Sequence, residues 1–423
     1  MAVKKRKTEE IDLLIEFGLD INPKHAKVQG PLSVACEEGD IGMVEFLLER
    51  GADPNVRAPG LRYPLYNACT TGNVALLQRL LDHGADSSVD GGEPFAQAIW
   101  GGKQMLDRLL QQLTSAQDRE RYLDRALQEA AYYAKLDICT WLLDAHGANL
   151  NYRGGMFGSP LQAALSCQRY ERGAEVNNRR LVVGMLLDRG ADVNPRPVPN
   201  PRYGSKPAAP EYFASPLTLA LERSSDLGRT ILAAGADANL LGGEYHSPLQ
   251  AAARLRTSML EPLLAAGADV NAMGGYKFGT ALHAAAYAHN LDAVRLLLAH
   301  AADVHVMAGK YGSALQAAAK RDSISSGSWT AGHASLAVMK ALVAAGADVH
   351  VQGGRYGSVL QMAAKSGNLE AVRWLLEDMG TDVEVRGGKF GGVQEAALVK
   401  ERWGVVSYLE MRYGQFVEGV GYP

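Results

Sequence analysis

The sequence is poor in cysteine, and its charges nearly cancel. It holds four cysteines in 423 residues, too few for a disulfide framework, so we expect all four to be small core residues of an intracellular protein. The formal net charge of −3 does not favour binding of bulk polyanions, and we do not expect direct nucleic-acid binding. No apolar run reaches membrane-spanning length, and we expect no membrane association.

The motifs of common catalytic sites are also missing. There is no His-Glu-x-x-His, no Gly-x-Ser-x-Gly and no paired Cys-x-x-Cys. The stretch from Gly274 to Thr280 has the glycine spacing of a phosphate-binding loop, but it lacks the lysine before the threonine, and related turns recur along the chain. We interpret its glycines as residues with positive φ at hairpin tips. The sequence therefore predicts no catalytic residue, no cofactor and no metal.

Repetition is what the sequence has in quantity. A phrase ending in Gly-Ala-Asp, or a close variant of it, closes seven stretches of the chain. Its glycines are Gly51, Gly84, Gly147, Gly190, Gly235, Gly267 and Gly346. Regular steps such as Gly51 to Gly84 span 32 to 34 residues, and longer steps of 43 to 45 residues contain insertions. A fixed phrase at a fixed period indicates an array of stacked units rather than one globular enzyme core.

Each unit has the same internal order, which residues 274–304 illustrate. A glycine turn comes first, and alanine-rich Ala281–Ala286 follows. The next segment places Leu291, Val294 and Leu297 on one helical face. Two such helices and a turn cannot bury their apolar faces alone, but they can when they stack on copies of themselves.

At these residues the chain resembles the ankyrin-repeat family. The resemblance rests on Thr280–Ala285, on the Leu-Leu pairs and on Gly-Ala-Asp followed by Val-Asn or Val-His, and it covers roughly residues 8–413. Units with Gly-Gly-x-Tyr-Gly and Leu-Gln-Ala-Ala-Ala resemble a style of repeat found in filamentous fungi. The family implies an all-α solenoid, here of about 11–12 helix-turn-helix units. It also implies β-hairpin fingers that form a concave binding face beside the inner helices.

The irregular parts of the chain define its expected organisation. We predict a basic segment and capping half-repeat in residues 1–30, the ankyrin-repeat array in 31–413 and a tail in 414–423. Within the array we expect a degenerate unit at about 91–124, where the stacking angle changes or a hinge lies, and insertions at about 169–180, 195–214 and 321–335. The proline-rich second insertion is either a docking segment for a proline-reading domain or a tolerated surface loop. We expect the other two insertions to be passive.

Repeat position explains most of the histidines. His83, His146 and His300 end outer helices, where a partial positive charge is favourable. His283 takes the place of a glutamine, and in the ankyrin family this side chain bonds the backbone between repeats. The equivalent glutamines are Gln162, Gln250, Gln316 and Gln361. We therefore expect these histidines to be part of the scaffold.

The expected finger tips carry a second pattern, an aromatic residue that mostly follows a basic one. The aromatic residues are Tyr63, Phe157, Tyr203, Tyr245, Phe278, Tyr311, Tyr356 and Phe390. The basic residues are Arg62, Arg202, Lys277, Lys310, Arg355 and Lys389. Stacking would place them in a basic-aromatic ladder that binds an acidic segment of a protein partner. Alternatively, the aromatic rings brace adjacent fingers and the cations are solvated.

The N-terminal run Lys4, Lys5, Arg6 and Lys7 resembles a nuclear-import signal, and its alternative is a solvated cap ahead of a helix. Acidic residues follow it, so we expect no secretory signal peptide. The sequence as a whole predicts a monomeric, non-catalytic scaffold for a protein partner, such as a nuclear regulatory adaptor or transcriptional co-regulator. The alternative is a cytoplasmic recognition array related to those of fungal sensor ATPases.

Overall fold

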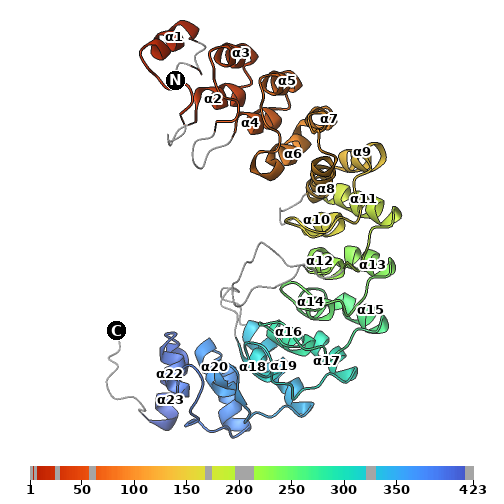
Figure 1. The fold of residues 1–423 in the computed structure, drawn as a ribbon. Helices are drawn as coiled ribbons and strands as arrows, with labels where there is room; N and C mark the ends of the chain where they lie inside the picture. The colour runs from red at the N-terminus through yellow and green to blue at the C-terminus, as the bar shows by residue number, and fades with distance from the viewer. Residues whose placement is uncertain are drawn as a thin grey trace. The chain divides into compact units, whose positions relative to one another are not determined.

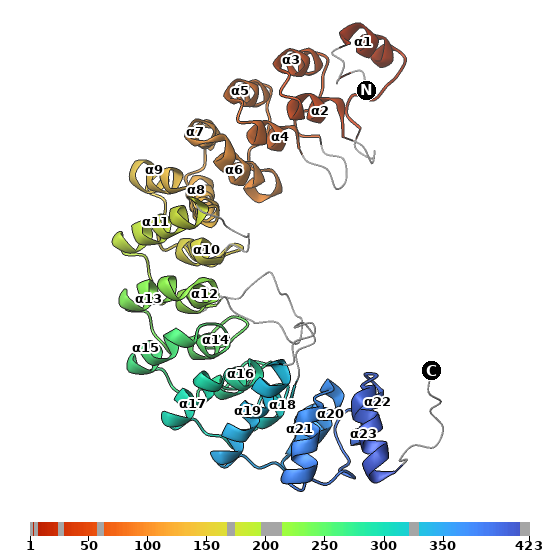
Figure 2. The ribbon, with the colours of Figure 1, turned by 180° about the vertical axis from the view of Figure 1, so that it is seen from behind.

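The computed structural model describes residue 3 and residues 7–23, 29–56, 63–166, 174–195, 214–320 and 330–414. It divides the chain into two compact units, residues 1–192 and 193–423. Within each unit, helices follow one another in antiparallel pairs, with the first, inner helix of each pair in one layer and the second, outer helix in another (Figures 1 and 2).

In the first unit, α1 (Thr8–Glu16) precedes five helix pairs (Figure 1). The pairs are α2 (Pro31–Glu37) with α3 (Ile41–Glu49), α4 (Pro64–Thr71) with α5 (Val74–Asp82), α6 (Val89–Gly101) with α7 (Lys103–Gln111), α8 (Ala116–Tyr132) with α9 (Leu136–His146), and α10 (Pro160–Ser166) with α11 (Ala174–Asp188).

The second unit contains six further pairs, two of which have an outer helix broken by a 3₁₀ turn, η2, or a π-helical turn, η3. They are α12 (Pro216–Arg223) with α13 (Ser225–Ala233), α14 (Pro248–Leu255) with η2 (Thr257–Met259) and α15 (Leu260–Ala265), α16 (Ala281–Tyr287) with α17 (Leu291–Ala299), α18 (Ala314–Ala319) with α19 (Thr330–Ala344), α20 (Val359–Ser366) with α21 (Leu369–Arg373) and η3 (Trp374–Asp378), and α22 (Val393–Leu398) with α23 (Trp403–Tyr413). The strands in the described residues are β1 (Gln352–Gly353) and β2 (Gly357–Ser358). The expected all-α solenoid is confirmed.

Polar caps define where the helices begin. Inner helices α12, α14, α16, α18 and α20 start after a serine or threonine whose hydroxyl accepts from a backbone N–H of the first turn. The backbone N–H groups of Ser313 and Ser358 also donate to the side-chain oxygens of Gln316 and Gln361, completing capping boxes. Several outer helices start after an asparagine or aspartate that caps in the same way, as Asn290 does for α17. In these repeats the local sequence therefore marks where the helices start.

The core lies between the two helix layers and between successive inner helices. Ala284, Ala285 and Leu297 are fully buried, so the alanine-rich inner helices approach their neighbours closely while leucines of the outer helices fill the space behind them. Cys36, Cys69 and Cys139 are also buried, and burial raises the pKa of the Cys36 and Cys139 thiols to about 12. The prediction that these three are core residues is confirmed; Cys167 lies outside the described residues.

The irregular parts differ in detail from the expectation. In the degenerate unit, Gly91 and Gly92 lie inside α6, and a side chain at Gly92 would come within 2.3 Å of the Tyr122 ring. The charged run 117–121 lies in the first turns of α8. The boundary between the two units falls at residues 192 and 193 and not in the degenerate unit. A hinge in the degenerate unit stays a prediction.

Parts of two insertions lengthen outer helices. Residues 174–180 lie in α11 and residues 330–335 lie in α19, and each of these helices has 15 residues, compared with nine in α17. Inserted residues can continue a helix because only the last turn of an outer helix is fixed by the glycine phrase. The remainder of both insertions and nearly all of the proline-rich insertion lie outside the described residues.

Candidate functional site

Hairpin fingers of the second unit stack backbone to backbone. The pair β1–β2 forms one finger, and antiparallel bridges at Gly274–Gly279, Ala308–Gly312 and Gly387–Gly391 form others. At their tips the N–H of each basic residue donates to the carbonyl of the preceding one, at 3.2, 3.4 and 3.0 Å. The residues joined in this way are Lys277, Lys310, Arg355 and Lys389. We call these four residues the tip row.

Glycine permits this close stacking. Gly354 has a φ of 63°, and a Cβ atom there would lie 2.7 Å from the backbone nitrogen of Gly312 in the preceding finger. Gly388 is similar, at 2.4 Å from the nitrogen of Gly357. A side chain at either position would separate the fingers and break the tip row. The sequence prediction of positive φ at the finger glycines is confirmed.

Buried polar side chains tie each inner helix to the next finger. The Gln316 amide donates to the carbonyls of Gly353 and Gly357 at 3.1 and 2.6 Å, and Gln250 and Gln361 make the same pair of bonds. The Nε2 atom of His283 lies 2.9 Å from the Gly312 carbonyl. Burial lowers the pKa of His283, so the imidazole is neutral. The predicted scaffold role of this position is confirmed.

The aromatic residues of the fingers stack on one another beneath the tips. Ring centroids lie 6.1 Å apart for Tyr245–Phe278 and 6.0 Å apart for both Tyr311–Tyr356 and Tyr356–Phe390. Phe278, Tyr311 and Tyr356 are only 1%, 5% and 7% exposed. The rings therefore brace adjacent fingers, as the alternative interpretation of the sequence had it, and most of their area is already covered. Contact between these rings and a partner stays a prediction.

The cations of the tip row stand above these rings. The ammonium groups of Lys277, Lys310 and Lys389 lie 4.9, 5.9 and 5.7 Å from the centroids of the adjacent Phe278, Tyr311 and Phe390 rings. Lys277 also pairs with Glu244 at 3.6 Å. In the part of the chain that the structure describes, the other three tip-row residues have no ion pair. The tip row is therefore a line of positive charge with little local compensation.

A second line of cations lies at the C-terminal ends of inner helices α14, α18 and α20. Each is the seventh residue after a serine cap: Arg254 after Ser247, Lys320 after Ser313 and Lys365 after Ser358. Arg254 and Lys320 lie over the Tyr287 ring, at 5.3 and 4.0 Å, and Lys365 lies 4.4 Å from the centroid of Tyr356. We call Arg254, Lys320 and Lys365 the inner row. The sequence pattern did not reveal this row, although counting seven residues from each serine cap aligns the three cations.

The cations of the inner row and their neighbours repel one another. Burial, followed by repulsion from Lys310, Lys320, Lys400 and Arg402, lowers the pKa of Lys365 to about 8. Lys320 donates to the Tyr287 hydroxyl, which holds its ammonium group beside the ring. Charges from one finger (Lys310), from the C-terminal ends of α18 and α20, and from the turn between α22 and α23 therefore act on one another.

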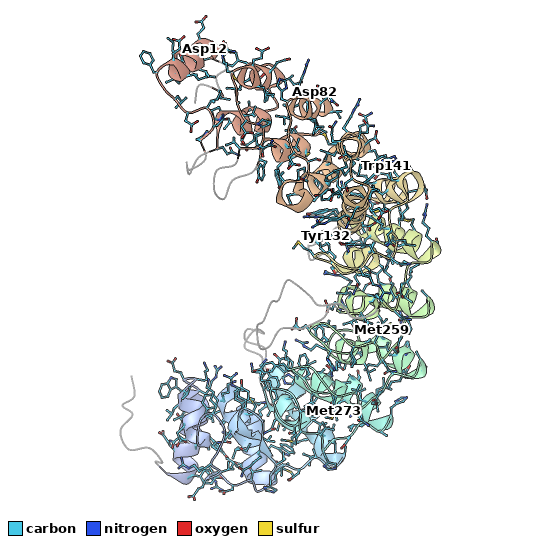
Figure 3. All side chains as sticks on the ribbon, in the orientation of Figure 1. Asp12, Asp82, Tyr132, Trp141, Met259 and Met273 are labelled. Carbon is cyan, nitrogen blue, oxygen red and sulfur yellow. The ribbon has the colours of Figure 1, made fainter. Side chains whose placement is uncertain are left out.

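The remaining predicted site residues lie elsewhere. Phe157 in the first unit is 5% exposed and stacks on Tyr132 of α8 at 4.5 Å. Tyr132 is labelled among the inner helices in Figure 3, whereas Trp141 belongs to outer helix α9. Tyr63 is half-buried at the start of α4. Lys7 pairs with Glu10. Arg62, Arg202, Tyr203, Lys4, Lys5 and Arg6 lie outside the described residues.

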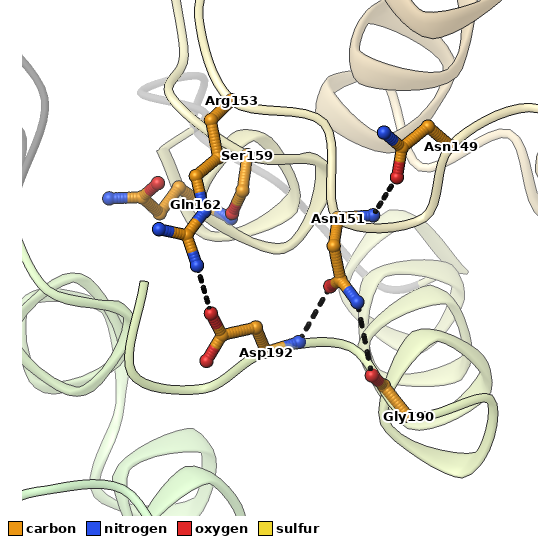
Figure 4. A network of polar contacts seen from close by, with 7 residues as sticks. All are labelled: Asn149, Asn151, Arg153, Ser159, Gln162, Gly190 and Asp192. Carbon is orange, nitrogen blue, oxygen red and sulfur yellow. Dashed lines mark hydrogen bonds and ion pairs between the residues drawn. The ribbon is translucent and has the colours of Figure 1, made fainter. Parts of the chain in front are cut away.

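Asparagine side chains join the turns of neighbouring repeats. The Asn151 amide donates to the Gly190 carbonyl at 3.5 Å, and its oxygen accepts from the Asp192 N–H at 2.8 Å (Figure 4). Arg153 adds an ion pair to Asp192. The same pair of hydrogen bonds recurs at the asparagines that occupy this position in other repeats. They are Asn22, Asn55, Asn194, Asn239 and Asn271.

The ring nitrogens of His83 and His300 each lie 2.9 Å from a carbonyl at the end of an outer helix, which agrees with the predicted scaffold role. Among the described residues, no group of three or more His, Cys, Asp or Glu side chains is placed to hold a metal ion. No helix in the described segments is long and apolar enough to span a membrane.

Comparison with known proteins agrees with this architecture. A model for ankyrin repeats in three copies matches residues 217–308 and 249–326, one for many copies matches residues 32–81, and a single-repeat model matches residues 355–385. No curated protein matches the chain. The matched segments lie in both units and coincide with the stacked helix pairs and fingers. The chain is therefore an ankyrin-repeat protein, a member of a family whose arrays serve as protein–protein interaction scaffolds.

Proposed function

We propose that the second unit binds an acidic segment of a protein partner along its finger tips. The observation that carries this proposal is the tip row, in which main-chain hydrogen bonds hold four cations side by side. Strands joined in this way lie about 4.8 Å apart. In an extended peptide, side chains on one face repeat at roughly 6.6 Å. Long lysine and arginine side chains can bridge this small difference, so acidic residues at alternate positions can follow the row.

Electrostatics sets the expected strength and its dependence on salt. An exposed ion pair contributes roughly 0.2–1 kcal/mol, so four of them contribute about 1–4 kcal/mol. Binding of this kind weakens as salt rises, because the Debye length falls from about 10 Å at 0.1 M to about 3 Å at 1 M. The covered aromatic rings would contribute by positioning the cations more than by direct contact.

A matched pair of double variants tests the proposal. Lys310→Glu with Arg355→Glu reverses the centre of the tip row, and Arg295→Glu with Lys340→Glu makes the same change in net charge on outer helices α17 and α19, where both residues are exposed. Binding of a fluorescent peptide with glutamate at alternate positions is measured by anisotropy. We expect at least a tenfold loss for the tip-row variant and a small change for the control. Equal losses in both variants would refute a specific acidic-segment site.

We further propose that the chain acts as a monomer and without catalysis, as a nuclear regulatory adaptor or transcriptional co-regulator. The run Lys4, Lys5, Arg6 and Lys7 supports nuclear entry, while the Lys7–Glu10 ion pair favours its alternative, a solvated cap on α1. Replacing Lys4, Lys5 and Arg6 with alanine should remove a tagged chain from the nucleus. A distribution that stays cytoplasmic in both proteins would favour a cytoplasmic recognition array instead.

A further inference from the structure

Three lysines of the second unit gather around a continuous group of tyrosine rings. Tyr287, Tyr311 and Tyr356 lie in sequence, with ring centroids 5.3 and 6.0 Å apart. The ammonium groups of Lys320 and Lys365 lie 4.0 and 4.4 Å from the centroids of Tyr287 and Tyr356. Lys310, a member of the tip row, lies over Tyr311 between them. We call Lys310, Lys320 and Lys365 the lysine cluster.

Positive charges crowd one another in the lysine cluster. Neither Lys310 nor Lys365 has an ion pair in the part of the chain that the structure describes. The pKa of Lys365 is lowered to about 8, first by burial and then by repulsion from its basic neighbours. Cation–π contacts are weak compared with the cost of holding like charges together where they are half-buried. A bound anion would relieve this cost.

We propose that the lysine cluster binds a phosphorylated side chain of the partner's acidic segment, an inference that rests on the proposed function of the tip row. A phosphorylated serine carries a charge of about −1.5 to −2 and three acceptor oxygens in one compact group. Three ammonium groups can each donate one charge-assisted hydrogen bond to such a group. A single carboxylate offers only one negative charge, so it would leave most of the repulsion in place.

The charges around the lysine cluster suit a protein segment better than a nucleic acid. Glu244 pairs with Lys277 at one end of the tip row. This carboxylate interrupts the positive surface, and a strand with a phosphate at every residue would meet it. A segment with one phosphate and spaced acidic residues can place its charges on the cations alone. The net charge of −3 also disfavours general polyanion binding.

Proton uptake gives this site a distinct signature. A bound dianion stabilises the charged form of Lys365 and raises its pKa from about 8 toward the ordinary range. Phosphopeptide binding should therefore take up protons near pH 8 and weaken between pH 7 and 9. Above pH 7 the phosphate itself is already mostly a dianion, since its second pKa is about 6. Replacement of Lys365 by glutamine should therefore make the affinity for the phosphopeptide less dependent on pH in this range.

The experiment uses the full chain and three labelled peptides of alternating glutamate and glycine. They differ only at the central position, which is phosphoserine, serine or glutamate. At pH 7 and low salt, we expect the phosphoserine peptide to bind about tenfold tighter than the serine peptide. Lys320→Gln and Lys365→Gln should each reduce this preference several-fold, while Lys365→Arg keeps most of it. Lys340→Gln, on the outer helix α19, is the matched control and should leave the preference unchanged.

The outcomes separate the two proposals. If no peptide binds, or if reversing Lys310 and Arg355 has no effect, the acidic-segment function fails and the phosphate site fails with it. If all three peptides bind equally and still depend on the tip row, only the phosphate site fails. Equal competition by an RNA oligonucleotide of the same charge would overturn the phosphate site in favour of general polyanion binding. Should Lys365→Gln unfold, Lys320→Gln and the pH profile of the wild-type chain still decide the question.

Discussion

The buried glutamine that ties α18 to the next finger gives a direct test of how neighbouring repeats are joined. Gln316 is fully buried, donates to the carbonyls of Gly353 and Gly357, and accepts from the Ser313 N–H at 2.7 Å. Gln316→Leu keeps the volume but removes all three bonds. A hydrogen bond contributes about 1 kcal/mol net, and a buried group left without a partner costs about 1–3 kcal/mol. We expect the variant to lose roughly 3–5 kcal/mol of stability.

The loss should be local, because the stability of a repeat array is approximately a sum over units and their interfaces. Hydrogen exchange of peptides covering 352–358 and α18 is therefore the appropriate assay, with urea unfolding as a second measurement. Gln316→His should be much milder, since His283 fills the same position and contacts the Gly312 carbonyl. Gln112→Leu, at an exposed position, is the control. A loss below about 1 kcal/mol, or equal damage from leucine and histidine, would refute the assignment.

Three further predictions concern junctions, protonation and finger stacking. Asn239→Ala should cost about 1–2 kcal/mol in urea unfolding by removing both bonds to the next turn, whereas His305→Asn should add such a clamp and stabilise by about 1 kcal/mol. Burial raises the pKa of Glu222 to about 7, so the folded state binds this proton more tightly than the unfolded chain. The free energy of unfolding of the wild type therefore falls as pH rises from about 4.5 to 7. The free energy of unfolding of Glu222→Gln should exceed that of the wild type by at most about 3 kcal/mol at pH 8 and match it at pH 4. Gly354→Ala should lower the melting temperature and weaken acidic-peptide binding, while Gly184→Ala, in a helix with free space, should be neutral or slightly stabilising.

The repeated phrase carries enough information to predict the architecture. Its period fixes the number of helix pairs in the described residues, and a serine, threonine or asparagine cap marks where many of the helices begin. Comparison of repeats also assigned His283 to the scaffold, because glutamine occupies its place elsewhere and the two side chains can donate to the same carbonyls. These features depend on local sequence and on nearest neighbours, which is why they could be inferred without a structure.

The inner row was not predicted because its pattern appears only after folding. Its equivalent positions hold Glu222, Arg254, Tyr287, Lys320 and Lys365, so residue type varies and no motif marks them. Lys310 and Lys365 are 55 residues apart in the sequence, and only the stacking of fingers on inner helices brings their charges into one field. The lengthening of α11 and α19 was missed for a related reason, since an insertion reveals its length but not whether it continues a helix.

The stacked fingers also explain why charge, rather than apolar area, is left for a partner. Main-chain hydrogen bonds fix the spacing of the tip row, so its cations can separate only by side-chain rotation. The rings beneath them are covered by their neighbours and hold the cations by cation–π contact. A surface built in this way keeps its repulsion until a ligand with complementary charge arrives. Binding should therefore weaken steeply with salt, whereas a ladder of exposed rings would bind through buried apolar area and be nearly insensitive to salt.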